Sequence, residues 1–149
     1  MKKQLINSFT DKYSLNGLIE SVKWSVVSAD NQIKTSSTSD DKNILAFVTL
    51  KDAAKLSDIE FGVNDTAKLK KMLGVLGDEV EIVPNTTNDK ITSITLTSEG
   101  TEVQYVTADL SVIPPVPTLK KMPVFNLEIP LTKEFVSTFV KAKSALTDV

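Results

Sequence analysis

The sequence contains no cysteine and no histidine. Disulfide bonds, thiol nucleophiles, imidazole bases and the common nitrogen or sulfur zinc sites are therefore excluded. Serine–histidine catalytic triads are excluded for the same reason. Only five glycines are present, all isolated, and the phosphate-loop pattern GxxxxGK[ST] does not occur. The chain therefore lacks the groups on which several large enzyme classes depend.

Acidic residues are present but do not form a catalytic pattern. Asp40-Asp41, Asp78-Glu79 and Asp89 fall in predicted turns, where charged side chains usually serve only to face water. Their spacing does not place any of them at a strand end opposite another acid. A glycosidase-like pair of carboxyl groups is therefore unsupported. A magnesium site built from oxygen ligands stays open, although no residue pattern indicates one. We predict that the protein is not an enzyme and uses no cofactor or metal.

Long hydrophobic runs are also missing. No apolar stretch approaches the roughly 18 residues that span a bilayer, and the N-terminal MKKQLINSF continues into polar residues instead of a signal-peptide core. We expect a cytoplasmic protein with no membrane partner. Seventeen basic residues against 19 acidic ones give a net charge of −2, so an anionic partner requires a local basic patch.

The clearest predicted element is an amphipathic helix from Asp65 to Leu76. Its apolar arc faces the core and its lysines point away; the arc contains Leu69, Met72, Leu73 and Leu76, opposite Lys70, Lys71 and Gly74. Asp65 is the expected N-cap, and Gly77 is the expected left-handed residue after the helix. Taken alone, the lysines are more typical of an ordinary solvated face.

The first half of the chain otherwise predicts one helix and four strands. The helix contains Leu5, Ile6 and Phe9 on its inner side, and Trp24 is expected in the core. The polar segment Gln32–Ser39 is typical of an edge strand, and the apolar segment Ile44–Leu50 is typical of a central strand. In order, the elements are a helix at Lys3–Lys12 and strands at Leu18–Ser28, Gln32–Ser39, Ile44–Leu50 and Ile59–Val63.

After Gly77 the pattern predicts an antiparallel meander of three strands. The strands are Glu79–Pro84, Ile91–Thr97 and Thr101–Ala108. Ser98-Glu99-Gly100 is short enough for a tight hairpin, whereas Asn85–Lys90 predicts a looser one. The fold class is therefore α+β, with amphipathic helices on one face of an antiparallel sheet.

Prolines concentrate after Ile113, which predicts an extended linker at 113–123 and a domain boundary. Beyond it we expect a strand at Val124–Ile129 and a helix capped by Thr132, with Phe135, Val136, Phe139 and Ala142 on its apolar stripe. The predicted organisation is a first domain at 1–112, a connector at 113–123 and a truncated second domain at 124–149. A strand followed by a lysine-bearing helix thus occurs twice, as a weak internal repeat.

Lysines accompany all three predicted helices. Packed side by side, such helices would present a positive strip suited to phosphate contacts without base readout. No aromatic residues alternate with these lysines, which favours duplex over single-stranded nucleic acid. The candidate DNA-facing residues are Lys2, Lys3, Lys12, Lys68, Lys70, Lys71, Lys133, Lys141 and Lys143.

The order of elements resembles the DNA sliding clamps, or polymerase processivity factors, of T-even-like tailed phages, and more distantly those of eukaryotes and archaea. The resemblance rests on DIEFGVNDTAKLKKMLGVLGDEVEI at 58–82, the proline-rich connector from Val112 to Pro130, LTKEFVSTFVKAKSAL after it, and QLINSF near the N-terminus. Residues 21–56 match in strand order only.

The resemblance implies a clamp-like fold in which helices line a ring and turn lysines toward the duplex. It implies a non-enzymatic processivity factor that encircles duplex DNA and tethers the replicative polymerase, with a clamp loader as a further partner and a homotrimeric ring as the assembly. The connector residues Val116, Leu119, Met122 and Phe125 would bind partners. The cytoplasm would be that of an infected host cell.

The chain departs from this family in length. It is shorter than a two-domain protomer and shows no strand before its first helix, so we expect a fragment; an unusual minimal clamp-like protein is the other reading. The alternative function is a phage interaction or assembly module that packs its helices on protein partners. Lysines gathered on one concave surface would favour the clamp, and lysines scattered over opposite faces would favour the module.

Overall fold

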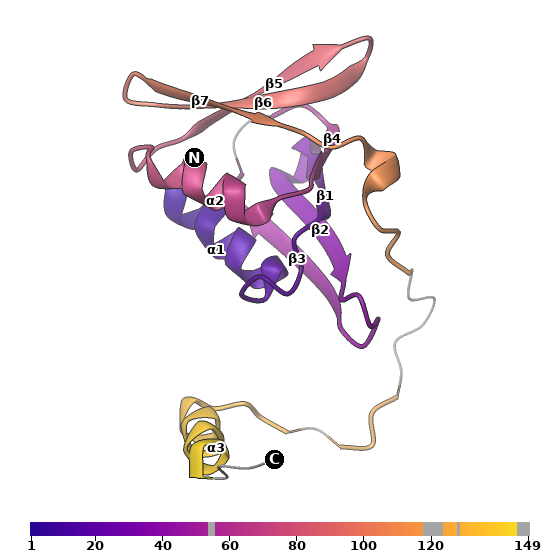
Figure 1. The fold of residues 1–149 in the computed structure, drawn as a ribbon, viewed down its shortest axis with the longest axis vertical. Helices are drawn as coiled ribbons and strands as arrows, with labels where there is room; N and C mark the ends of the chain where they lie inside the picture. Colours follow the sequence, from indigo (N-terminus) through magenta and orange to yellow (C-terminus); the bar gives the residue numbers. More distant parts are fainter. Residues whose placement is uncertain (54–55, 118–123, 128, 146–149) are drawn as a thin grey trace. The chain divides into compact units, whose positions relative to one another are not determined.

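The computed structural model describes residues 1–53, 56–117, 124–127 and 129–145. The chain divides into two compact units, Met1–Pro117 and Thr118–Val149. The first unit contains two antiparallel sheets and two α-helices (Figure 1).

The first sheet has the strand order β3-β2-β1-β4. Its strands are β1 (Val22–Val27), β2 (Gln32–Thr38), β3 (Leu45–Lys51) and β4 (Ile59–Val63). The helix α1 (Lys3–Ser14) packs on β2 and β3, and α2 (Thr66–Gly74) lies beside α1 (Figure 1). The two amphipathic helices predicted for this region are therefore confirmed as a packed pair.

The core forms where the inward side of β1 meets α1. Trp24 is only 1% exposed, as predicted, and its ring makes edge contacts with Phe9 at 5.1 Å and Tyr13 at 6.3 Å between centroids. Phe61 of β4 also packs against the indole, at 5.5 Å between ring centroids. Burying each such aromatic side chain contributes about 1.5–3 kcal/mol, so this cluster holds α1 against the sheet.

The second sheet is the predicted meander, with β5 (Glu81–Thr87), β6 (Lys90–Ser98) and β7 (Thr101–Val106) in sequence order. Both of its hairpins turn on two residues with positive φ, Asn88-Asp89 and Glu99-Gly100. This geometry matches the twist of the flanking strands. The loose loop expected at Asn85–Lys90 is wrong, because β5 continues through a bulge at Asn85/Thr86 up to the tight turn.

The expected places of β2 and β3 are reversed. The polar β2 lies inside the sheet, and the apolar β3 forms its edge. Small polar side chains tolerate this position because they find partners: the Thr35 hydroxyl donates to the Lys23 carbonyl at 2.7 Å. On β3, Phe47 is 60% exposed. Apolar content alone therefore gave the wrong strand order.

Three local expectations for the helices also need correction. Leu5 is 36% exposed, so the inner side of α1 is formed by Ile6 and Phe9 without it. The helix α2 ends at Gly74, and its C-cap Val75 is right-handed. Gly77 instead allows a close approach to the β6–β7 turn, since a Cβ there would lie 2.7 Å from the Glu99 side chain.

The second unit contains α3 (Lys133–Ala145), a helix whose N-cap is Thr132 as predicted. The Thr132 hydroxyl oxygen accepts a hydrogen bond from the Phe135 amide at 3.1 Å. The strand expected at Val124–Ile129 is wrong: residues 124–127 and 129 form no strand, and no strand of the described residues pairs with them. The proposed strand–helix repeat loses its second strand.

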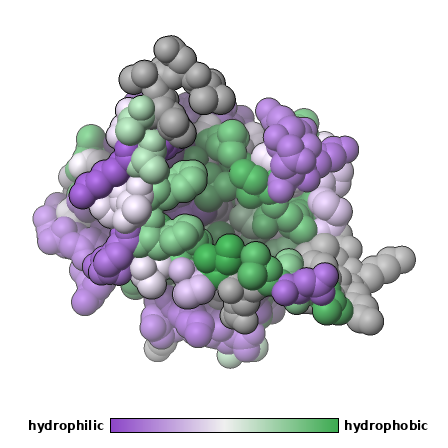
Figure 2. Space-filling model, turned by 90° about the horizontal axis from the view of Figure 1, so that it is seen from below, coloured by the Kyte–Doolittle hydropathy of each residue, from purple (hydrophilic) through white to green (hydrophobic). Residues whose placement is uncertain are grey.

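Large apolar side chains remain exposed, and part of their hydrophobic surface is visible in Figure 2. Four of them form the apolar stripe of α3, namely Phe135, Val136, Phe139 and Val140. Of the helices in the described ranges, none has the length and hydropathy needed to cross a membrane.

Candidate functional site

The candidate site is the outward surface of α1 and α2, here called the helix-pair face. On α2 the Asp65 carboxylate accepts a hydrogen bond from the Lys68 amide at 2.7 Å, which caps the first turn as predicted. Leu69 and Leu73 are fully buried. This anchoring leaves Lys68 and Lys71 exposed.

The same logic orients α1. Ile6, Phe9 and Tyr13 are buried against the sheet. Lys12 is exposed near the C-terminal end of the helix, and Lys2 is exposed next to its start. The apolar sides of the two helices therefore fix which way their lysines point.

A buried polar network joins the two helices. The Thr66 hydroxyl donates to the Glu20 carbonyl at 2.8 Å and lies 3.1 Å from the Tyr13 hydroxyl, which can donate to it in turn. Burial raises the pKa of Tyr13 to about 12, so the phenol stays neutral at physiological pH. The network locks the start of α2 against the end of α1.

Two of the predicted DNA-facing lysines have partners within the protein. Lys70 forms an ion pair with Asp11 across the contact between α2 and α1. Lys3 donates to the Leu76 carbonyl at 2.6 Å, just beyond the end of α2. These two side chains help to hold the two helices together. The sequence did not indicate these contacts, because the partners lie far apart along the chain.

The helix-pair face is nonetheless positive. Residues 2–14 and 65–74 contain six lysines and two aspartates, an excess of four positive charges. The whole chain has a net charge of −2. Lys2, Lys12, Lys68 and Lys71 form no ion pair within the described residues. Flexible ammonium groups of this kind can contact phosphate oxygens.

The remaining predicted site residues lie elsewhere. Lys133, Lys141 and Lys143 are exposed on α3, in the second unit. Among the connector residues, Val116 is half-buried and Phe125 is 71% exposed. Leu119 and Met122 lie outside the described residues.

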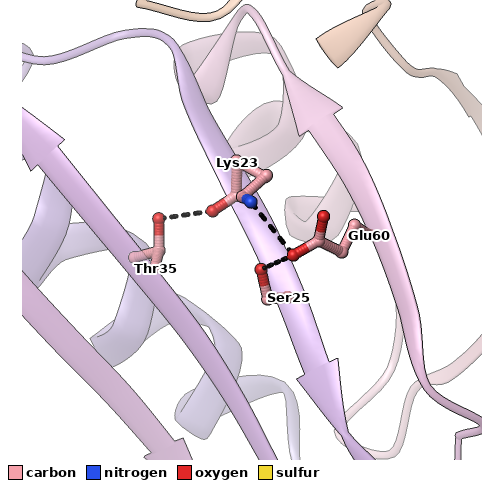
Figure 3. Close-up of polar contacts among 4 residues, drawn as sticks. All are labelled: Lys23, Ser25, Thr35 and Glu60. Atoms are coloured by element: carbon pink, nitrogen blue, oxygen red, sulfur yellow. Dashed lines mark hydrogen bonds and ion pairs between the residues drawn. The ribbon is translucent and has the colours of Figure 1, made fainter. Parts of the chain in front are cut away.

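The opposite face of the first sheet carries lysines of a different kind. Figure 3 shows Glu60 of β4 accepting from Lys23 at 3.0 Å and from Ser25 at 2.8 Å, both on β1. The hydrogen bond from the Ser25 hydroxyl lowers the pKa of Glu60, and the hydrogen bond from Lys23 lowers it further. Lys34 is paired with Asp30 at 3.4 Å. Sequence reasoning missed this cluster because it depends on strand register.

No protein-family model matches the sequence, and no curated protein matches it. Solved structures do. The chain is similar to the DNA polymerase III subunit beta from Pseudomonas aeruginosa, with a TM-score of 0.56 and 14% identity over 83% of this chain. It is also similar to the DNA polymerase sliding clamp from Pseudomonas aeruginosa with ligand, with a TM-score of 0.53 and 14% identity over 79% of this chain.

These likenesses establish the fold. The α+β prediction is confirmed, and the arrangement of sheets and helices is that of sliding-clamp domains. The chain spans about a third of the length of the two bacterial proteins, since it covers 33% and 31% of theirs.

Proposed function

We propose that this protein is a sliding-clamp component, a non-enzymatic processivity factor that holds a replicative polymerase on duplex DNA. The observation that carries the proposal is the helix-pair face: two packed helices, on a fold shared with sliding clamps, concentrate lysines on a chain of negative net charge. In this proposal the helix-pair face lies next to the duplex.

The chemistry of the face supports contact with the phosphate backbone. Lys68 and Lys71 are point charges on flexible stems, without a fixed fork that could select one base. Contacts of this kind are independent of sequence and weaken as salt rises. Such contacts permit sliding, because no phosphate along the duplex is preferred over the next.

The finer parts of the proposal follow from the sequence resemblance. They are a T-even-like phage origin, a homotrimeric ring, a clamp loader and a polymerase that contacts the connector at Val116, Leu119, Met122 and Phe125. The domain limits of 1–112, 113–123 and 124–149 belong to the proposal too. The division of the chain between Pro117 and Thr118 falls inside the proposed connector and supports it.

Charge reversal on the helix-pair face tests the proposal. The variant Lys68→Glu/Lys71→Glu should bind duplex DNA more weakly. The plot of log K against log salt should become shallower, with the magnitude of its negative slope reduced by about 2. The matched control is Lys34→Glu/Lys51→Glu, which reverses two charges on the other face of the first sheet. Fluorescence anisotropy with two unrelated duplexes over a salt series measures both effects.

Equal loss of binding in the two variants would contradict a duplex-facing helix pair. A polymerase assay on circular primed DNA completes the test: with its loader and polymerase, the protein should lengthen the products, and the Lys68/Lys71 variant should lengthen them less. Unchanged product length with the unmodified protein would count against a processivity factor.

The alternative of an interaction or assembly module is favoured by a different observation. The apolar stripe of α3 is uncovered, with Phe139 63% exposed. In that function α3 packs on a protein partner, and the lysines only solvate the helix-pair face. DNA binding that is weak and unaffected by the Lys68/Lys71 variant would support the module.

A further inference from the structure

The strand β4 leaves part of its backbone edge open. It is the outermost strand of the first sheet, next to β1. Beyond it the Ala108 amide donates to the Gly62 carbonyl at 2.9 Å, after which the chain turns away into the short helix η2 (Leu110–Val112). Among the described residues, no strand pairs with the edge from Asp58 to Phe61.

The alternation of a β-strand shows which groups this edge presents. The Gly62 carbonyl points away from β1, toward Ala108. The amide and carbonyl of Glu60, two residues earlier, point to the same side. An extended chain placed beside Glu60 would therefore continue the row of backbone hydrogen bonds that Ala108 begins.

A groove of about 460 Å³ lies along this edge. One wall is the β5–β6 hairpin end, and the other is the segment from Ala108 to Leu110. Four large apolar residues line it, namely Ile59, Phe61, Ile91 and Leu110. The Phe61 side chain is buried in the core, Ile59 and Ile91 are half-buried, and Leu110 is 40% exposed.

The rim of the groove is acidic. Its carboxyl groups are those of Asp58, Glu60, Asp89 and Asp109. Among the described residues of the lining, Lys90 is the only basic one, and its ammonium lies 3.2 Å from the Asp109 carboxylate, which neutralises the lysine charge. Asp58 and Asp89 form no ion pair within the described residues.

Hydrogen bonds lower the pKa of two of these carboxyl groups. The Ser111 amide lowers the pKa of Asp109 to about 2. The Ser28 amide donates to Asp58 at 2.6 Å and lowers the pKa of that carboxyl. Within the residues that the structure describes, no group of three or more acidic side chains converges to hold a metal ion. The charge is therefore spread along the groove instead of focused on one point.

We propose that this groove binds an extended segment of a protein partner, in which basic and apolar residues alternate, as an added strand on the free edge of β4. Backbone hydrogen bonds to Glu60 supply affinity that does not depend on sequence, and alternate side chains select the segment. The apolar residues pack against Ile59 and Leu110, and the basic residues meet the acidic rim. This site is separate from the helix-pair face and does not depend on DNA contact.

Fluorescein-labelled peptides test the charge complementarity. The complete chain should bind the peptide KVKLKVK and not its counterpart EVELEVE, as measured by fluorescence anisotropy. The variant Asp58→Asn/Asp89→Asn should weaken binding of the cationic peptide at least tenfold. The control Glu81→Gln/Glu102→Gln, which removes two charges from the second sheet, should leave it unchanged. Equal binding of both peptides, or equal effects of both variants, would overturn the proposal.

Amide hydrogen exchange in the unmodified protein tests strand addition directly. The peptide should slow exchange of the Glu60 amide. The amides of Ile59 and Phe61 point toward β1, so their exchange should change little. Peptide binding without protection at Glu60 would refute the added strand. Displacement of the peptide by millimolar magnesium chloride at constant ionic strength would indicate a cation site instead. Protection of Glu60 that rises with protein concentration alone would assign the edge to a second copy of this chain.

Discussion

Asp11 of α1 and Lys70 of α2 form an ion pair across the contact between the two helices. Lys70 was expected to face DNA, but part of its charge is neutralised by this intramolecular ion pair. The pair also gives the helix-pair face an acidic residue among its lysines. A single aspartate thus both fastens α2 to α1 and moderates the positive field.

Replacing Asp11 with asparagine should strengthen duplex binding and steepen its salt dependence by about 1 in the log–log slope, because Lys70 becomes available to phosphate. The free energy of unfolding should change by at most about 1 kcal/mol, since both partners are substantially exposed. Anisotropy titrations and urea denaturation measure the two effects. Asp30→Asn, which breaks the Lys34 pair, is the control; if it strengthens binding equally, the effect is one of net charge.

Lys3 and Lys12 should behave differently although both belong to α1. Lys3→Met removes the hydrogen bond to the Leu76 carbonyl and should cost about 1 kcal/mol of unfolding free energy, with an unchanged salt slope. Lys12→Met should leave the free energy of unfolding within about 0.5 kcal/mol. It should reduce the magnitude of the salt slope of DNA binding by about 1. The opposite pattern would make Lys3 the DNA contact.

Gly62 should not tolerate a side chain. A Cβ there would lie 2.7 Å from the Ala108 carbonyl oxygen, so Gly62→Ala should destabilise the protein by about 1–3 kcal/mol in urea unfolding. Gly74→Ala is the matched control, because a Cβ at that position meets nothing within 4 Å. In the last turn of α2 it should stabilise the protein by up to about 1 kcal/mol. Equal effects would show that β4 does not depend on the Ala108 contact.

Tyr13 should make stability fall at high pH. Burial raises its pKa to about 12 in the folded protein, above the ordinary tyrosine value of 10.0, so the folded state holds the proton more tightly. The stabilisation is therefore complete below pH 10 and is lost as pH rises toward 12, with a magnitude on the order of 2–3 kcal/mol. Urea unfolding from pH 8 to 12 should show a shallower decline for Tyr13→Phe. Some decline will remain, because burial also raises the pKa of Tyr105.

Local signals predicted local structure well. Asp65 before an apolar arc placed the start of α2, and Glu99-Gly100 placed a tight hairpin, because caps and two-residue turns depend on neighbouring residues. Strand order was not predictable in the same way. Burial of β2 depends on α1 covering it, and a strand at Val124–Ile129 would need a partner strand, so neither follows from the segment itself.

The candidate site was predicted in outline only. The side on which Lys68 and Lys71 lie follows from the helical period. The pairing of Lys70 with Asp11 joins residues 59 positions apart, and the Glu60 cluster requires the register of β1 against β4. Such long-range relations determine which lysines are available to a partner, and no periodicity in the sequence encodes them.

The single tryptophan of this chain gives the molecule a built-in optical reporter. Trp24 packs against Phe9 and Tyr13 of α1 and against Phe61 of β4. Its emission should stay blue-shifted when a ligand touches only the outer surfaces of α1 and α2. A shift to longer wavelength would signal that α1 has lifted from the sheet. Unlabelled protein can therefore distinguish a ligand that rests on the helices from one that pulls them away.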